Sequence, residues 1–579
     1  MENNLYNIRH SLAHLLAMAA LEHDKDALLS VGPVTENGFY YDIRFSEGHM
    51  PSQDDLKAFE KSMRKLVNKK IAFTKREVST EEARKTFAAN PYKLAIIDDI
   101  EKEGSAITFY DTADFTDLCE GPHIENTGEI DAKSFALTHL AGAYWRGDEK
   151  NDMLTRIYGL AFSTEAELDS YLASQEEAKK RDHKKLGIEL DLFTFSDLVG
   201  SGLPLWTPRG TIIRNLLDGY IWDMRESVGY QKVEIPHITK KDLYEKSGHW
   251  DKFKDELFRI TTREGHEFAM KPMNCPHHTQ IYARRQWSYR ELPQRYANST
   301  ACYRDEQSGE LSGLSRVRSF TQDDAHVFCR TDQIHDEILK IWDIVTKFYG
   351  SFGFELHVRI SKHDPETPEK FLGNKDTWAI TEKILSDIAA EKNVAATEGI
   401  GEAAFYGPKL DFMAKDALGR EWQVATIQLD MNMPERFDLF CINEEGAKER
   451  IVMIHAAIMG SIERFMSILI EHYAGAFPFW LAPVQIAILP VGEDIYEYAE
   501  EINLVLKKLG YRTEMKMNDT LGKRIRETKV EKIPYTLVLG KQEVENKTIT
   551  LESYAKGKVG VFPIQELLDI FADDIASKH

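Results

Sequence analysis

The chain has 579 residues, which is too long for a single hydrophobic core, so three or four domains are expected. Hydrophobic residues make up 42% and charged residues 29%, proportions typical of a soluble globular protein. The net charge of −21 argues against a protein that coats nucleic acid through the field of its whole surface. Any nucleic acid must therefore be held by local basic patches.

The cysteines and the apolar segments predict a cytoplasmic protein with no membrane segment. The five cysteines lack the close spacing of a disulfide framework, as expected in a reducing compartment: Cys119, Cys275, Cys302, Cys329 and Cys441. The N-terminus, MENNLYNIRH, has no apolar signal-peptide core. The most apolar run, FPFWLAPVQIAILPV, is interrupted by three prolines and is too short to span a bilayer.

The N-terminal region combines a helix with two pairs of metal-binding residue types. NIRHSLAHLLAMAALEH has an apolar stripe at helical spacing, and its His10 and His14 share one face. Downstream, TDLCEGPHIE places Cys119 and His123 at the same four-residue offset. These four residues resemble a tetrahedral zinc set. The alternative is a pair of helix histidines near an unrelated loop.

The next elements lead to a domain boundary. Residues 31–43 predict two strands joined by an Asn37-Gly38 turn, and residues 54–70 predict an amphipathic helix. Residues 165–190 predict one long polar helix that ends in a basic cluster, Lys179 to Lys185. Such a cluster is typical of the solvated face of a linker.

From about Asp191 the pattern indicates antiparallel sheet with interspersed helices. A helix over 211–228 and a strand ending at Pro236 come first, and a helix over about 332–350 follows later. Further strands contain FYGPKLDFMAKD, REWQVATIQLD and IVMIHAA, and a helix begins after Gly460-Ser461. No GxGxxG or GxxxxGK[ST] string occurs, so Rossmann and P-loop interpretations lack their motifs.

The stretch from Cys302 to His326 predicts a long hairpin whose loop carries Gly309 and Gly313. Side chains alternate along a strand, so the even-numbered residues share one side. In the second strand that side carries two cations, an aromatic ring and a terminal histidine, which favours a site for an anion with a nearby base: Arg316, Arg318, Phe320, Gln322, Asp324 and His326. In the first strand it carries Arg304 and Glu306. A solvated surface hairpin is the alternative.

After Pro483, strands and helices alternate over about a hundred residues, which indicates a compact α/β domain. One basic cluster there could hold phosphates or simply be solvated surface: Lys523, Arg524, Arg526 and Lys529.

Several of these segments together resemble a known family. The helix and strand ending at Pro236, the hairpin with Arg304 and Glu306, and GSIERF with Arg464 resemble motifs 1, 2 and 3 of class II aminoacyl-tRNA synthetases. MKPMNCPHH, RVRSFTQDDAH and VMIHAAIMGSIERF are similar to threonyl-tRNA synthetases, and HSLAH, TDLCEGPH and AGAYWRGD to the editing domain of that family. The resemblance starts at the editing domain, without the N-terminal ubiquitin-like domain common in bacterial forms.

This resemblance implies an α+β multidomain fold. An α+β editing domain would occupy residues 1–175, a linker helix 176–190, the antiparallel class II catalytic domain 191–480 and an α/β anticodon-binding domain 481–579. The last departs from the family because GKQEVENKTITLESYAKGK lacks the expected arginine-rich strand. The implied function is ATP-dependent activation of L-threonine, its transfer to the 3′ end of tRNA(Thr), and hydrolysis of mischarged seryl-tRNA(Thr). The implied assembly is a cytoplasmic homodimer without a DNA partner.

The resemblance also assigns nucleotide-binding residues. Arg304 would hold the α-phosphate of ATP and Arg464 the γ-phosphate, since guanidinium groups fork toward phosphate oxygens. Glu306 would accept from the adenine amino group, Phe320 would stack on the ring, and Mg²⁺ would accompany ATP. Arg316 and Gln423 complete the implied set.

Cys275, His326 and His455 match the family's zinc ligands, with one Zn²⁺ per subunit. Three protein ligands leave positions open, which the family fills with the amino and hydroxyl groups of threonine. The matching amino-acid pocket comprises Met273, Gln322, Asp324, Tyr406 and Gln428.

Editing answers a selectivity problem. A site that binds a hydroxyl rejects valine by roughly 10⁴–10⁵, whereas serine lacks only a methyl group, worth about 1–3 kcal/mol. A second hydrolytic site is therefore needed, and the residues that resemble it are His10, His14, Lys93, Asp117, Cys119 and His123. The family's set is described as working without metal, so the zinc interpretation of these residues becomes secondary.

Two rival functions remain from the sequence. One is a related class II synthetase for another small amino acid. The other is a non-catalytic tRNA- or mRNA-binding paralogue, which would have no need of Arg304, Glu306, Arg464 and three zinc ligands.

Overall fold

A computed structural model describes residues 2–578. The chain divides into two compact units, Met1–Glu176 and Glu177–His579, and each is described by itself. Within the described residues, no helix combines the length and apolar character needed to cross a membrane.

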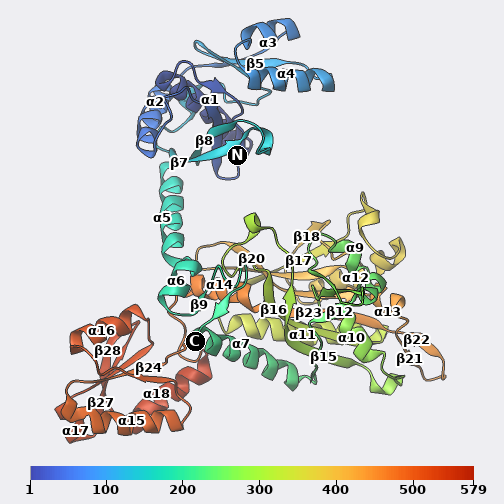
Figure 1. Ribbon diagram of the computed structural model, residues 1–579, viewed down its shortest axis with the longest axis vertical. Helices are drawn as coiled ribbons and strands as arrows, with labels where there is room; N and C mark the ends of the chain where they lie inside the picture. The colour runs from blue at the N-terminus through green and yellow to red at the C-terminus, as the bar shows by residue number, and fades with distance from the viewer. Residues whose placement is uncertain (1, 579) are drawn as a thin grey trace. The chain divides into compact units, whose positions relative to one another are not determined.

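The first unit is built around an antiparallel sheet covered by two helices (Figure 1). Helix α1 (Glu2–His23) buries Leu12, Leu15 and Leu16, as its apolar stripe predicts. Helix α2 (Leu56–Asn68) packs beside it, within the predicted span. The sheet contains β1 (Leu28–Leu29), β3 (Gly38–Arg44), β8 (Met153–Ala161) and β7 (Phe135–Tyr144), and β2 (Val34–Thr35) pairs with β3 across the predicted turn.

A smaller subdomain of this unit supplies several of the predicted editing residues. Helix α4 (Pro91–Glu103) is capped by Asn90, whose side chain accepts from the Tyr92 and Lys93 backbone N–H groups, and Pro91 occupies the first turn. The cap fixes where Lys93 lies. The remaining elements are β4 (Phe73–Glu77), β5 (Thr108–Thr112), β6 (Phe115–Leu118) and α3 (Thr80–Thr86).

The predicted single helix over 165–190 is wrong. It is two helices, α5 (Glu165–Arg181) and α6 (His183–Glu189), which break at Asp182. Asp182 has a non-helical backbone, with φ −49° and ψ 117°, and its side chain accepts from the Lys184 N–H as a helix cap. The start of α6 buries His183.

The second unit contains the expected antiparallel sheet, with eight strands and only its two edge pairings parallel. The predicted fold class is confirmed. The strand order is β11 (Gln231–Lys232), β15 (Gln294–Tyr303), β16 (Ser319–Cys329), β23 (Val452–Ser461), β20 (Glu421–Asp430), β19 (Lys409–Lys415), β17 (Leu356–Lys362) and β18 (Ala396–Ile400).

Three helices pack against this sheet and against each other (Figure 1). Helix α7 (Pro208–Ser227) starts earlier than predicted, because Thr207 caps it and Pro208 suits its first position. Helix α11 (Ile334–Gly350) matches its prediction. Helix α14 (Ile462–His472) follows β23 directly, with the Ser461 side chain accepting from the Arg464 N–H. The strand expected to end at Pro236 is only the two-residue β11.

The loop of the hairpin is longer than predicted and contains three of the residues predicted to bind the nucleotide. The ladder ends at Tyr303 and begins again at Ser319, so Arg304, Glu306 and Arg316 are not strand residues. The backbone N–H of Asp305 donates to the carbonyl of Glu256, and that of Arg318 donates to the carbonyl of Gly202. These groups therefore bond to other segments instead of continuing the ladder. Strand β16 is also buried over Asp323–Cys329, which excludes a solvated surface hairpin.

The C-terminal part is the predicted α/β domain. Strands β25 (Thr513–Met515), β24 (Ile486–Pro490) and β26 (Tyr535–Leu539) are parallel, and β27 (Thr548–Ser553) and β28 (Gly557–Pro563) extend the sheet antiparallel. Its helices are α15 (Tyr496–Lys508), α16 (Leu521–Val530), α17 (Lys541–Asn546) and α18 (Ile564–Ser577).

A buried ion pair beneath β16 predicts a large stability effect. Arg225 Nη1 lies 2.5 Å from Asp323 Oδ1, and the other carboxylate oxygen accepts the N–H groups of Ile458 and Met459. Arg225→Met leaves a buried carboxylate unpaired and is expected to cost about 3–5 kcal/mol of unfolding free energy. Urea denaturation followed by tryptophan fluorescence measures it. Adding Asp323→Asn should restore much of the lost stability, because the amide oxygen still accepts. An unfolding free energy of Arg225→Met equal to that of the wild type would contradict this role of the ion pair.

Candidate functional site

The loop between β15 and β16 and the start of α14 line one cavity of about 310 Å³. Five of the six predicted nucleotide-binding residues are among its lining. The lining comprises Arg304, Glu306, Ser315, Arg316, Val317, Phe320, Ser461 and Arg464.

Two arginines of this cavity, Arg304 and Arg464, are arranged to receive an anion. The Arg304 guanidinium lies 5.2 Å from the ring centroids of both Phe253 and Phe320. Its Nε is buried and has no hydrogen-bond partner among the described residues. Arg464 is exposed and lies over the Trp422 ring at 5.8 Å. Aromatic contacts hold both side chains while leaving their donors available.

The remaining predicted nucleotide residues differ in position. Arg316 contacts Glu306 through both Nε (2.8 Å) and Nη2 (2.7 Å), and both contacts use Glu306 Oε2. Gln423 does not line the cavity. It donates to Asp411 at 2.8 Å and accepts from Arg359 at 3.3 Å.

Strand register brings the three predicted zinc ligands together. His326 on β16 pairs directly with His455 on β23, so the ring nitrogens Nε2 and Nδ1 lie 3.1 Å apart. Cys275 begins α10 (Cys275–Tyr282), and one ligand atom from each of the three lies within 4.8 Å of the others. Nitrogens sharing a tetrahedral zinc at 2.0–2.1 Å are about 3.3 Å apart, so the residues fit this ion.

Second partners orient both imidazoles toward the same point. His455 Nε2 lies 2.9 Å from Asp430 Oδ2, which fixes the proton on Nε2 and leaves the Nδ1 lone pair free. His326 Nδ1 lies 2.8 Å from His278 Nδ1, which leaves Nε2 facing His455. Burial lowers the pKa of His326 well below its usual value, so the ring is neutral as a metal ligand requires.

The structure adds residues that the sequence analysis missed. Asp430 could have been found, because it lies two residues after Gln428 on one face of β20. His278 lies within the quoted NCPHH string but carried no spacing signal. His249 Nε2 lies 3.5 Å from Cys275 Sγ, and no sequence pattern connects the two.

The predicted amino-acid pocket surrounds this triad. The Tyr406 ring stacks on His455 at 4.7 Å, and its hydroxyl donates to Gln428. Asp324 accepts from Asn274 at 3.1 Å, and burial raises the pKa of its carboxyl to about 6. Gln322 and Asp324 share a face of β16 with His326. Met273 packs against the cluster that contains Cys275 and Tyr406.

The four N-terminal residues predicted to form one group also meet. Cys119 Sγ lies 3.3 Å from His10 Nε2 and 3.3 Å from His123 Nε2. His14, from the same face of α1 as His10, offers a ligand atom within 4.8 Å of the others. Helix histidines near an unrelated loop are therefore excluded.

A buried carboxylate completes this second site. Asp117 lies 2.5 Å from Lys93 Nζ and accepts from the Tyr41 hydroxyl at 2.5 Å. A cavity of about 230 Å³ is lined by residues of both groups, including His10, His14, Lys93, Asp117 and Cys119. Tyr41 and Ser11, which contacts His123 at 3.0 Å, were not predicted.

The basic cluster of the C-terminal domain is only partly available to phosphates. Arg524 is buried, and its Nη1 donates to the Pro490 and Lys516 carbonyls. Lys523 pairs with Asp519 at 2.8 Å. Arg524 therefore has a structural role.

Family models match three regions of the chain. Residues 258–473 match the tRNA synthetase class II core domain (G, H, P, S and T), residues 485–574 match an anticodon-binding domain, and residues 107–158 match the threonyl and alanyl tRNA synthetase second additional domain. With the antiparallel sheet and the arginine-lined cavity, these matches define a class II aminoacyl-tRNA synthetase.

Individual relatives show to which family within the class II synthetases the chain belongs. Threonine–tRNA ligase from Cytophaga hutchinsonii is 46% identical over 98% of this chain and 88% of that protein. The enzyme from Thermosynechococcus vestitus is 45% identical over 99% and 96%. The RNA binding domain of threonyl-tRNA synthetase from Cryptosporidium parvum Iowa II is 35% identical with a TM-score of 0.65, over 68% of this chain and 98% of that chain. The chain belongs to the threonine–tRNA ligase family.

The protonation of the Cys119 thiol can be measured through its rate of alkylation. Burial raises the pKa of the Cys119 thiol to about 11, so the thiol is protonated at neutral pH. Its alkylation by iodoacetamide should accelerate about tenfold per pH unit up to pH 10, without levelling near 8.5 as an ordinary cysteine does. Mass spectrometry of the Cys119 peptide measures the rate. A flat profile, as for a metal-bound or nucleophilic thiolate, contradicts this state.

Proposed function

We propose that the chain activates L-threonine with ATP, transfers it to the 3′ end of tRNA(Thr), and hydrolyses seryl-tRNA(Thr) at a separate site. The observation that carries this proposal is the course of β16. Its loop end reaches the arginine-lined cavity, and its buried end carries His326 opposite His455.

In the proposed activation step, the arginines bind the phosphates and the chain holds the two substrates in line. Arg304, with its unpartnered Nε, takes the α-phosphate, and Arg464 takes the γ-phosphate, with Mg²⁺ neutralising the rest. Phe320 stacks on adenine. Because Arg316 uses only Oε2 of Glu306, the other oxygen accepts from the adenine amino group. Catalysis is then mainly orientation and electrostatic stabilisation as the threonine carboxylate attacks the α-phosphorus, the bond to the β-phosphate breaks and pyrophosphate leaves.

We assign the threonine site to the triad and its surroundings. Cys275, His326 and His455 would hold one Zn²⁺, which supplies open positions for the substrate amino and hydroxyl groups when bound. Asp430 and His278 orient the imidazoles. Gln322, Asp324, Met273, Tyr406 and Gln428 line the substrate side. Gln423, which bonds Asp411, is kept as a nucleotide-side residue of this proposal.

The editing reaction is assigned to the N-terminal cavity. His10, His14, Cys119 and His123 would bind the misacylated 3′ end and position a water molecule. Lys93 and Asp117 form a buried pair beside them. The neutral thiol of Cys119 suits hydrogen bonding to the seryl group rather than covalent catalysis.

The proposal includes a cytoplasmic homodimer that reads the anticodon through its C-terminal domain. The family match to an anticodon-binding domain supports this last part.

One prediction of the proposed function concerns threonine activation. Cys275→Ser and His326→Ala should each largely abolish threonine-dependent ATP–pyrophosphate exchange and remove bound zinc, measured by plasma emission spectrometry. Asp430→Asn keeps all three ligands and should weaken zinc affinity about 10–100-fold, because the His455 orientation is lost.

Cys119→Ser is the matched control and should leave exchange and zinc content unchanged. Exchange that survives both Cys275→Ser and His326→Ala refutes the triad assignment. A preference for another amino acid in the same assay would favour a different class II synthetase, and exchange with none would favour a binding-only protein.

Another prediction of the proposed function concerns editing of seryl-tRNA. Cys119→Ala and His14→Ala should preserve threonine activation but lose deacylation of preformed seryl-tRNA, since the cavity lies in the other unit of the chain. Release of labelled serine measures the reaction. Deacylation at the wild-type rate in both variants removes the editing assignment.

A further inference from the structure

A buried histidine of the linker contacts the nucleotide loop. His183, at the start of α6, is 3% exposed. Its Nδ1 lies 2.6 Å from Glu471 Oε1, and the same oxygen accepts its backbone N–H at 3.2 Å. Its Nε2 accepts the N–H of Leu314 at 3.1 Å. Because a backbone N–H can only donate, Nε2 carries the lone pair and Nδ1 carries the proton.

The loop tip is shaped to receive this ring. Gly313 has a φ of +51°, and a Cβ at that position would lie 2.3 Å from His183 Nε2. Only glycine both adopts this backbone easily and leaves room for the imidazole. The next residues are fixed as well, because Ser315 Oγ lies 3.0 Å from Ser467 Oγ on α14.

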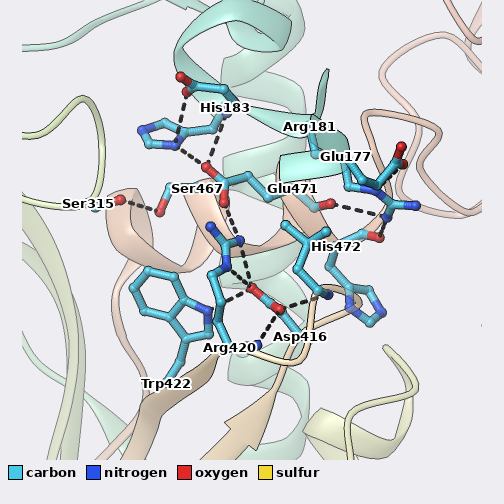
Figure 2. A network of polar contacts seen from close by, with 12 residues as sticks. Glu177, Arg181, His183, Ser315, Asp416, Arg420, Trp422, Ser467, Glu471 and His472 are labelled. Carbon is cyan, nitrogen blue, oxygen red and sulfur yellow. Dashed lines mark hydrogen bonds and ion pairs between the residues drawn. The ribbon is translucent and has the colours of Figure 1, made fainter. Parts of the chain in front are cut away.

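The second oxygen of Glu471 belongs to a polar network that includes Arg420, Asp416 and Trp422 (Figure 2). Glu471 Oε2 accepts from Arg420, whose Nε donates to Asp416 at 2.7 Å. Asp416 also accepts the indole N–H of Trp422 at 2.9 Å. Trp422 is the ring beneath Arg464. The Glu471 carboxylate therefore connects the loop tip at Leu314, through His183, with the Trp422 ring that lies beneath Arg464.

The linker also contacts the C-terminal end of α14. Arg181 Nη1 donates to the carbonyl of His472 at 3.0 Å and lies 3.5 Å from that of Glu471. A cation suits this end of a helix, where carbonyls lack intrahelical partners. Glu177 holds the Arg181 Nε at 2.8 Å (Figure 2).

A metal site is the competing explanation for this cluster. Asp182, His183 and Glu471 have ligand atoms close enough to bind an ion. Both nitrogens of His183 are already used, however, and Glu471 is paired with Arg420. The hydrogen bonds leave the ring no free lone pair for a metal.

We propose that His183 and Glu471 are positioning residues that hold the 304–318 loop and Arg464 in the geometry that binds ATP. Neither residue lines the nucleotide cavity, so both act through their contacts. The linker helix is thus part of the nucleotide site's support. The proposal rests on the proposed role of this loop in ATP binding.

Two substitutions separate the two hydrogen bonds of His183. In His183→Gln, the side-chain oxygen reaches the position of Nε2 and can still accept from Leu314. In His183→Asn, the amide replaces only Nδ1 and keeps the bond to Glu471. Loss of the loop bond in His183→Asn should raise the KM for ATP about three- to tenfold, with the KM for threonine unchanged. In His183→Gln, which keeps the loop bond, the KM for ATP should stay close to the wild-type value.

Steady-state ATP–pyrophosphate exchange on the full chain measures both KM values. Gly313→Ala, which places a methyl group against the imidazole, should reproduce the His183→Asn effect and carries the test if His183→Asn does not fold. His363→Asn and His363→Gln are matched controls. His363 makes the same pair of bonds to Glu382, through its N–H (3.0 Å) and Nδ1 (2.6 Å), outside the loop.

Arg304→Ala separates failure of this inference from failure of the proposed function. If Arg304→Ala raises the KM for ATP but His183→Asn and Gly313→Ala do not, the positioning role is wrong and the nucleotide site stands. If Arg304→Ala leaves the KM for ATP unchanged, the proposed nucleotide site is wrong. Equal increases in the KM for ATP and threonine, or no difference between His183→Asn and His183→Gln, overturn the inference in favour of general loosening of the fold.

Discussion

The pairing of β16 with β23 is the constraint on which the rest of the catalytic unit depends. Its register sets His326 opposite His455 at one end and Gln322 opposite Ser461 at the other. Ser461 caps the helix that carries Arg464. A slip of one residue would turn every side chain of β16 to the opposite face of the sheet. One strand pair therefore fixes both the two facing imidazoles, which we propose bind zinc, and the start of the helix that carries Arg464.

A strand this polar is stable because its buried groups bond to partners on other elements, some on packed helices and loops and some on neighbouring strands. Arg225 neutralises Asp323, and Asn274 donates to Asp324. His278 and Asp430 serve the two imidazoles. Unpaired, such groups would each cost about 1–3 kcal/mol or more. The same partners that offset burial also choose the tautomers and orientations, so stability and proposed chemistry rest on the same contacts.

The sequence predicted the sheet class, the α1 stripe and the shared face of Gln322, Asp324 and His326, because these follow from periods of 3.6 and 2. Resemblance, rather than periodicity, supplied Cys275 and His455. Sequence could not show that β16 is buried, since distant helices such as α14 cover it, or that the ladder ends at Tyr303, since Glu256 and Gly202 take the next backbone hydrogen bonds. The break before His183 was missed because the polar, charged stretch gave no sign that Asp182 caps a new helix, and because Glu471, the buried partner of His183, lies 288 residues away.

X-ray absorption at the zinc edge of the full chain tests the central claim most directly. If the β16–β23 register assembles the metal site, the spectrum contains one sulfur at about 2.3 Å and nitrogen or oxygen ligands at about 2.0–2.1 Å. The sulfur contribution should persist in Cys119→Ser and disappear in Cys275→Ser. A sulfur shell that remains in Cys275→Ser, or that is lost in Cys119→Ser, would contradict the account.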